Sequence, residues 1–118
     1  MRRRLGRRLV GVALVGGGAL GLSACSSQST GLARQACAQV DASLRLYGRA
    51  QHATGAAQVR LLQRANVDLR EALPNAALAA SSDTDFQALA ATLSESSRVP
   101  ESDLTGALRA QCANLAGA

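Results

Sequence analysis

The chain has 118 residues and a formal net charge of +5, from 13 arginines, no lysine and eight acidic residues. This length allows one domain at most. Five of the arginines lie within residues 1–8, and from residue 25 onward eight arginines balance the eight acidic groups. Because this remainder is neutral, and the chain contains one Tyr, one Phe and no Trp, the composition argues against nucleic-acid binding.

Residues 1–24 have the three-part layout of a secretory signal peptide. A basic segment ends at Arg8, residues 9–22 are uncharged and mostly apolar, and the small residues Ser23 and Ala24 follow. The apolar stretch has 14 residues, five of them glycine, whereas a helix that spans a bilayer needs about 20. We therefore predict a cleaved export signal rather than the alternative, an uncleaved membrane anchor.

The sequence Leu22-Ser23-Ala24-Cys25 resembles the lipobox of bacterial lipoproteins. This resemblance implies that a diacylglyceryl group is attached to the Cys25 thiol through a thioether and that the signal peptidase cleaves before Cys25. Two or more acyl chains hold a protein stably in a bilayer, where one chain binds marginally. The resemblance therefore predicts lipidation at Cys25, with the protein on the extracytoplasmic face of the cell membrane.

Removing 24 residues leaves a mature chain of 94. Residues 25–31 comprise the lipidated cysteine and a polar run, Ser-Ser-Gln-Ser-Thr-Gly, that predicts a flexible tether. Six residues reach at most about 20 Å when fully extended, so we expect the folded domain, residues 32–118, to stay close to the membrane.

With Cys25 assigned to lipid, two cysteines remain, Cys37 and Cys112. Outside the cytoplasmic membrane thiols can stay oxidised, so this pair predicts one disulfide. The alternative is a metal-binding or catalytic cysteine pair. It lacks support because the chain has no Cys-x-x-Cys motif and His52 is its one histidine.

The first predicted helix covers residues 31–52, because apolar residues recur there at helical spacing. They are Cys37, Val40, Leu44 and Tyr47. Thr54-Gly55 should separate this helix from the next, since glycine suits a helix end.

The second helix is predicted from a 3-4-3-4 repeat that indicates a packing seam. The members of the repeat are Val59, Leu62, Asn66, Leu69 and Leu73. Within it, Asn66 either fixes the helix register or is partly exposed, and we favour exposure. Pro74 ends or kinks a helix, but alanine-rich sequence continues to residue 82, so we expect a kinked continuation.

Thr84-Asp85-Phe86-Gln87 fits a capping box that opens a third helix. We expect its buried face to consist of Phe86, Leu89, Ala90 and Leu93. Pro100 suits the first position of a last helix, whose apolar face is Leu104, Leu108, Cys112 and Leu115. No strand-like alternation appears, so the sequence predicts an all-α bundle of three or four helices with one disulfide. Abundant alanine favours close packing with little room for a ligand.

Candidate catalytic and metal sites are weak. A Ser-His-Asp triad would need His52, but no motif places a nucleophile on a strained turn. Asp83-Thr84-Asp85 resembles the start of a calcium loop, yet Ala88 and Ser94 stand where that loop has Gly and Glu. We predict that the protein is not an enzyme and has no cofactor or metal. A set of charged residues instead predicts an exposed, charge-paired face of the second helix; it comprises Arg64, Asp68, Arg70 and Glu71.

The segment from Val99 to Cys112, together with the use of arginine without lysine, is similar to small helical lipoproteins of high-GC Gram-positive bacteria. This resemblance implies a location and a fold but no activity. We predict a non-catalytic interaction or structural module, anchored in the membrane, whose partner is an envelope protein. The alternative is a small binding protein for an apolar or cell-wall ligand, with the second and third helices parting around Pro74.

Overall fold

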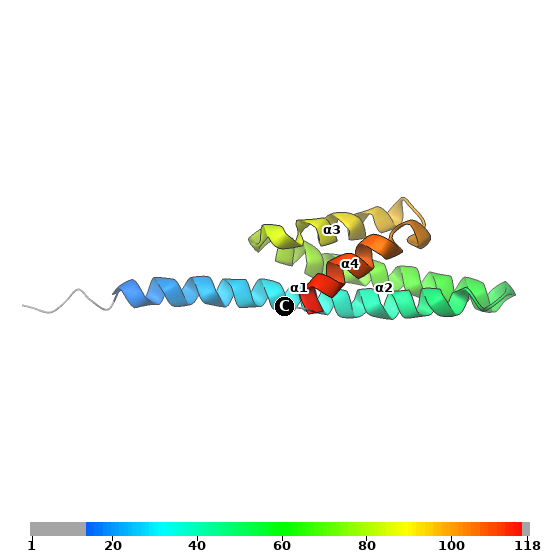
Figure 1. Cartoon of the computed structure of the whole chain (residues 1–118), viewed down its shortest axis with the longest axis horizontal. Helices are drawn as coiled ribbons and strands as arrows, with labels where there is room; N and C mark the ends of the chain where they lie inside the picture. The colour runs from blue at the N-terminus through cyan, green and yellow to red at the C-terminus, as the bar shows by residue number, and fades with distance from the viewer. Residues whose placement is uncertain (1–13, 117–118) are drawn as a thin grey trace, which may run out of the picture.

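The computed structural model describes the backbone of residues 14–116 and the side chains of residues 27–115, and this part of the chain is helical without a strand. Two long helices, α1 (Leu14–Ala50) and α2 (Gly55–Ser82), run antiparallel, and α3 (Gln87–Ser94) and α4 (Thr105–Ala116) pack against them (Figure 1). The single 3₁₀ turn η1 (Thr84–Phe86) lies between α2 and α3, and η2 (Glu95–Ser97) and η3 (Glu101–Asp103) lie between α3 and α4. The predicted all-α bundle is confirmed, with four α-helices in the described residues.

Helix α1 begins well before the expected start at Gly31, so residues 27–31 are helical where the sequence predicts a flexible tether. The physical reason is packing against the end of α2. Ser29 is buried, and Leu32 of α1 and Leu78 of α2 line the same hollow. The 28 residues of α2 are long enough to cover α1 beyond Gly31. Residues 1–13 and the Cys25 side chain lie outside the described residues, so the signal peptide and its cleavage site stay predictions.

The predicted break between the first two helices is confirmed. Helix α1 ends at Ala50, and α2 starts at Gly55, whose φ of 61° lies in the left-handed region. Glycine adopts this conformation without the steric penalty that a Cβ atom imposes. Gly55 therefore lets the chain reverse direction within a few residues.

The buried stripe of α2 differs from the predicted seam. Leu69 is buried as expected and Leu73 is partly buried, but Val59 and Leu62 are 51% and 39% exposed. Alanines fill the buried stripe instead, because small side chains let the two long helices approach closely. The buried residues of α2 are Ala65, Leu69, Ala72, Ala76 and Ala79.

The disulfide between Cys37 and Cys112 is confirmed and joins α1 to α4, with the two Cα atoms 5.5 Å apart. The cysteines belong to one continuous apolar core. The predicted apolar face of the last helix is buried in this core, as are Leu89 and Leu93 of α3, and Phe86 and Ala90 pack against it.

Pro74 lies inside α2, so the predicted continuation of the helix is confirmed. Ala72 and Ala76, on either side of it in sequence, are fully buried. The helix therefore stays packed in the core at this point.

Two predicted helix starts differ from the structure. Asp83, rather than Thr84, caps the third helical segment, because its carboxylate accepts a hydrogen bond of 2.9 Å from the Asp85 backbone N–H. Pro100 precedes the turn η3 instead of opening an α-helix, and α4 begins only at Thr105. The capping box and the proline position were therefore wrong in detail, because short 3₁₀ turns precede both α-helices.

Candidate interaction site on helix α2

The large apolar side chains that are exposed within the described residues all belong to α2. They are Val59, Leu62, Val67 and Leu78, with exposed fractions of 51%, 39%, 48% and 57%. Exposed apolar groups scattered singly are ordinary, whereas groups gathered on one face indicate a contact surface. Val59, Leu62 and Val67 lie within nine consecutive residues of α2 and form such a group.

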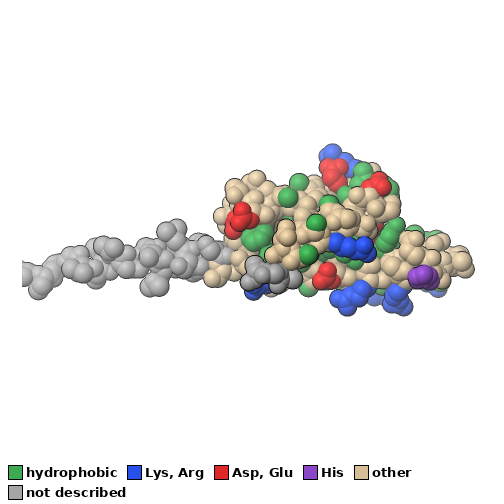
Figure 2. All heavy atoms as spheres, in the orientation of Figure 1, with side chains coloured by type: hydrophobic (Ala, Val, Ile, Leu, Met, Phe, Trp, Pro, Cys, Tyr) green, Lys and Arg blue, Asp and Glu red, His purple; other side chains and the backbone are tan. Residues whose placement is uncertain are grey.

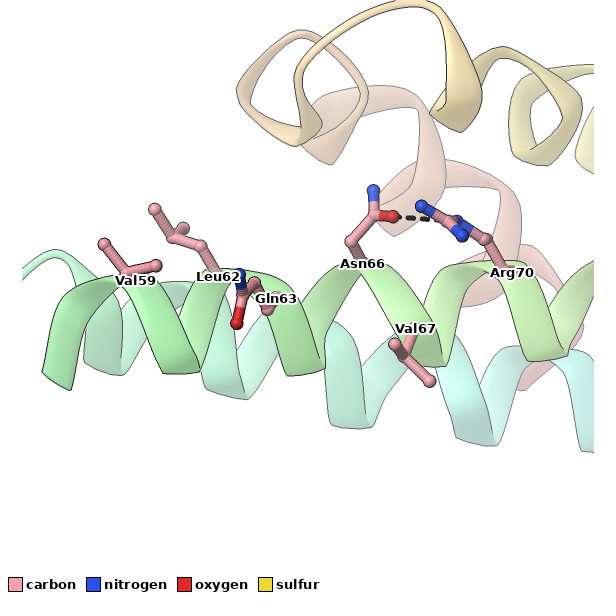
Figure 3. Close-up of a pocket in the computed structure, with 6 residues that line it drawn as sticks. All are labelled: Val59, Leu62, Gln63, Asn66, Val67 and Arg70. Atoms are coloured by element: carbon pink, nitrogen blue, oxygen red, sulfur yellow. Dashed lines mark hydrogen bonds between the residues drawn. The ribbon is translucent and has the colours of Figure 1, made fainter. Parts of the chain in front are cut away.

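A shallow, open hollow of about 430 Å³ lies over this part of α2. The side chains that line it recur along the helix at intervals of three and four positions, which places them on one broad side of the helix. We call this surface the α2 face; it consists of Val59, Leu62, Gln63, Asn66, Val67 and Arg70 (Figure 3).

Asn66 and Arg70 form the polar end of the α2 face. The Arg70 Nε donates a hydrogen bond of 2.9 Å to Asn66 Oδ1, which Figure 3 marks with a dashed line. The Asn66 Nδ2 in turn donates to the Ser96 carbonyl at 3.5 Å. Asn66 is partly buried, in agreement with the prediction of partial exposure.

The predicted charge pairing on α2 is wrong. The ion pair found within the described residues joins Glu95 to Arg98 at 3.8 Å, and both side chains are exposed. Arg70 bonds to Asn66, because Asn66 lies one turn earlier on the same side of the helix.

A second hollow, of about 370 Å³, adjoins the α2 face because Leu62 and Asn66 line both. It extends the concave surface from α2 to the end of α1 at Tyr47 and to η3 at Glu101. Three elements that are distant in sequence therefore contribute to one continuous surface.

A buried hydrogen-bonded group joins α1, α2 and η3 next to this surface. The Ser43 hydroxyl of α1 is fully buried, and its oxygen lies 2.6 Å from the Ala65 carbonyl oxygen of α2 and 3.0 Å from Glu101 Oε2 of η3. A hydroxyl has a single proton to donate. When the Glu101 carboxyl is protonated, its O–H donates to Ser43, and Ser43 donates to Ala65, so each oxygen is satisfied.

The environment of Glu101 shifts its carboxyl toward the protonated form relative to a carboxyl in water. Burial raises the pKa of the Glu101 carboxyl above its ordinary value, and the nearby charge of Asp68 acts in the same direction, while the hydrogen bond with Ser43 opposes both. This group was not predicted from the sequence. The available signal was Ser43 itself, a polar residue between Val40 and Tyr47 on the apolar face of the first helix.

A third hollow, of about 510 Å³, lies where Thr30 of α1 approaches η1 and α4. Phe86 and Gln111 are among the residues that line it. The Gln111 Nε2 donates to Thr92 Oγ1 at 3.0 Å, while its Oε1 is buried without a hydrogen-bond partner. An unpaired buried oxygen is costly, so this hollow is the second candidate binding site.

The structure also places the other residues considered from sequence. His52 is exposed in the turn after α1, and Asp83 and Asp85 belong to the capped turn η1. Within the described residues, no cluster of three or more His, Cys, Asp or Glu side chains is arranged to hold a metal ion. No helix in that part of the chain combines the length and hydropathy needed to cross a membrane.

Comparison with known proteins gives no relative: no family model, curated protein or solved structure matches this chain. The function is therefore argued from the surfaces described above and from the N-terminal sequence.

Proposed function

We propose that this protein is a membrane-anchored envelope lipoprotein whose helical bundle is a non-catalytic interaction module, with the α2 face as its contact surface. The observation that carries the proposal is the exposure of Val59, Leu62 and Val67 on one face of a helix that the core holds rigidly. Covering their exposed parts contributes about 1 kcal/mol each at about 25 cal/mol per Å², so an apolar partner surface gains from this contact.

The anchoring part of the proposal rests on the lipobox at residues 22–25. The disulfide between Cys37 and Cys112 supports it, because stable disulfides occur outside the reducing cytoplasm. The test is a Cys25→Ser variant grown with a clickable fatty acid. We expect label on the wild-type protein and none on the variant, and label that persists on Cys25→Ser would overturn the assignment.

The interaction surface is tested with a photo-crosslinking amino acid placed at Val59 or Val67 in living cells. Leu78 is the matched control, because it is exposed on the same helix but lies about three turns beyond Val67, outside the hollow. We expect adducts of the same mass from Val59 and Val67 and none of that mass from Leu78. Absence of an adduct, or the same adduct from all three positions, contradicts the proposed surface.

The second candidate function is a small binding protein for an apolar or cell-wall ligand. The hollow of about 510 Å³ with the unpaired Gln111 Oε1 supports it, because small-molecule sites occupy roughly 300–1,000 Å³ and contain a few polar groups. A ligand of the folded state raises its Tm. Extracted envelope lipids and cell-wall fragments should raise the Tm of the wild type more than that of Gln111→Leu, and an equal or absent shift removes this candidate.

A further inference from the structure

The charge of the bundle is divided sharply along the chain. Residues 27–64 contain five arginines and one acidic residue, whereas residues 65–115 contain three arginines and seven acidic residues. The two halves therefore carry formal charges of +4 and −4, although the bundle as a whole is neutral. The net charge of zero does not reveal this separation of positive from negative charge, which gives a small protein a large electric dipole.

The positive half includes a row of exposed arginines on α1. Arg34, Arg45 and Arg49 are separated by 11 and four positions, which is close to whole helical turns, and all three are exposed. Asp41 is the acidic residue on the same side. We call this row the basic face. The opposite side of α1 supplies core residues such as Ala36 and Val40, so the basic face points away from the bundle.

Acidic side chains gather on the other side of the molecule, in the turns η1, η2 and η3 on either side of α3. We call them the acidic layer; they are Asp83, Asp85, Glu95, Glu101 and Asp103. On the surface shown in Figure 2, most blue side chains lie along the edge formed by α1, while most red side chains lie over the layer that contains α3. Within the described residues, the arginines of the basic face take part in no ion pair. Their guanidinium groups are therefore available to anions from outside the protein.

We propose that the basic face binds the anionic headgroups of a lipid bilayer, with α1 lying along the membrane and the acidic layer facing away from it. Guanidinium groups pair with phosphate through two parallel hydrogen bonds. The row from Arg34 to Arg49 extends over about 22 Å of helix, and its nearly straight course matches a flat surface of repeated negative charges. The acidic layer is repelled by the same surface, which fixes the orientation.

This inference rests on the proposed function, because the lipid anchor is what keeps the protein next to the membrane. In a helix, Arg34 lies about 14 Å along the axis from Cys25, so a lipid on that cysteine keeps the basic face within reach of the headgroups. Each arginine near an anionic membrane strengthens binding by about fivefold, and the two effects act together.

The test compares arginine reactivity on two kinds of vesicle. The mature protein, purified with its anchor, is reconstituted in phosphatidylcholine vesicles with or without phosphatidylglycerol and treated with phenylglyoxal, and modified arginines are identified by mass spectrometry. We expect Arg34, Arg45 and Arg49 to react more slowly on the anionic vesicles, and Arg98 and Arg109 to be unaffected. High salt should remove the protection. Equal protection of Arg109, equal protection on neutral vesicles, or no protection overturns the proposal.

Matched variants separate the basic face from net charge. Arg45→Gln/Arg49→Gln and Arg98→Gln/Arg109→Gln remove the same two charges. The reactivity of Arg34 toward phenylglyoxal reports the ratio of protein with its basic face on the membrane to protein with that face free. We expect the first double variant to reduce this ratio by about thirtyfold and the second to leave it nearly unchanged. Equal reductions overturn the proposal. If the wild-type protein carries no fatty-acid label, the lipid anchor alone is refuted. The basic face can still be tested in that case, because the protein without an anchor can be mixed with an excess of anionic vesicles and its arginine reactivity measured.

Discussion

Glu101 allows a direct test of the buried polar group that joins α1, α2 and η3. The change is Glu101→Gln, because a glutamine amide donates to the Ser43 hydroxyl from the position that the protonated carboxyl occupies. Ser43 then donates to the Ala65 carbonyl at pH values where the wild-type carboxyl is ionised. The substitution keeps the size of the side chain and removes its charge.

The sign of the pH dependence follows from the raised pKa of Glu101. The folded state holds the proton more tightly than the unfolded state, so this group stabilises the fold fully below its ordinary pKa of 4.5. That contribution is lost as the pH rises through the higher folded-state pKa. Glu101→Gln should therefore match the wild type in acid and be more stable at neutral pH.

The expected size is that of one hydrogen bond in a half-buried site. Ser43 is fully buried while Glu101 is only partly so, which places the gain at neutral pH at about 1 kcal/mol and the rise in Tm at several degrees, roughly 4–8 °C. Thermal unfolding followed by circular dichroism between acid and neutral pH measures both. Asp103→Asn, an exposed change on the same turn, is the control.

One result would refute this reasoning. If Glu101→Gln and the wild type show the same dependence of Tm on pH, or if the variant is less stable at neutral pH, then the Glu101 carboxylate is the form that Ser43 stabilises. The arrangement in which a protonated Glu101 donates to Ser43 would then be incorrect.

Three further predictions concern the fold. Replacing Cys37 and Cys112 by alanine opens a link between residues 75 positions apart and should lower the free energy of unfolding by about 4–5 kcal/mol, as measured by urea denaturation; an unchanged midpoint would contradict a structural role for the bond. Leu69→Ala should cost about 2–5 kcal/mol, because Leu69 is fully buried, whereas Val67→Ala on the α2 face should cost far less in the same assay. Gly55→Ala should lower stability by about 1–2 kcal/mol, since its φ is positive, and an unchanged or higher Tm would show that the turn relaxes.

Much of the fold could be predicted because the relevant signals are local. Apolar residues at helical spacing locate α3 and α4, and their buried faces match the expected residues. The continuation of α2 through Pro74 also followed from the alanine-rich sequence after it. These predictions succeeded because burying a stripe of leucines at helical spacing is favourable, and in α3 and α4 those stripes face the core.

The α2 face could not be predicted, because alanine fits equally well in a core and on a surface. Reading the larger side chains as the core made Val59 and Leu62 part of a packing seam, although both are exposed. Close approach of α1 to α2 selects the alanine stripe instead, and that approach depends on both helices at once. The interaction surface is therefore a consequence of tertiary packing.

By itself, the sequence determined the helical class and the break at Gly55, because these depend on backbone preference. It also predicted the pairing of Cys37 with Cys112, once the lipobox resemblance had assigned Cys25 to lipid. It also separates the basic N-terminal segment from a neutral bundle. Only the tertiary structure decided which side of α2 is buried and brought Ser43 to Glu101, 58 positions away. The net charge of +5 gives no sign of a further consequence of folding. The neutral bundle has a basic face on α1 and an acidic layer on the opposite side, because the elements that carry each charge pack on different sides of one core.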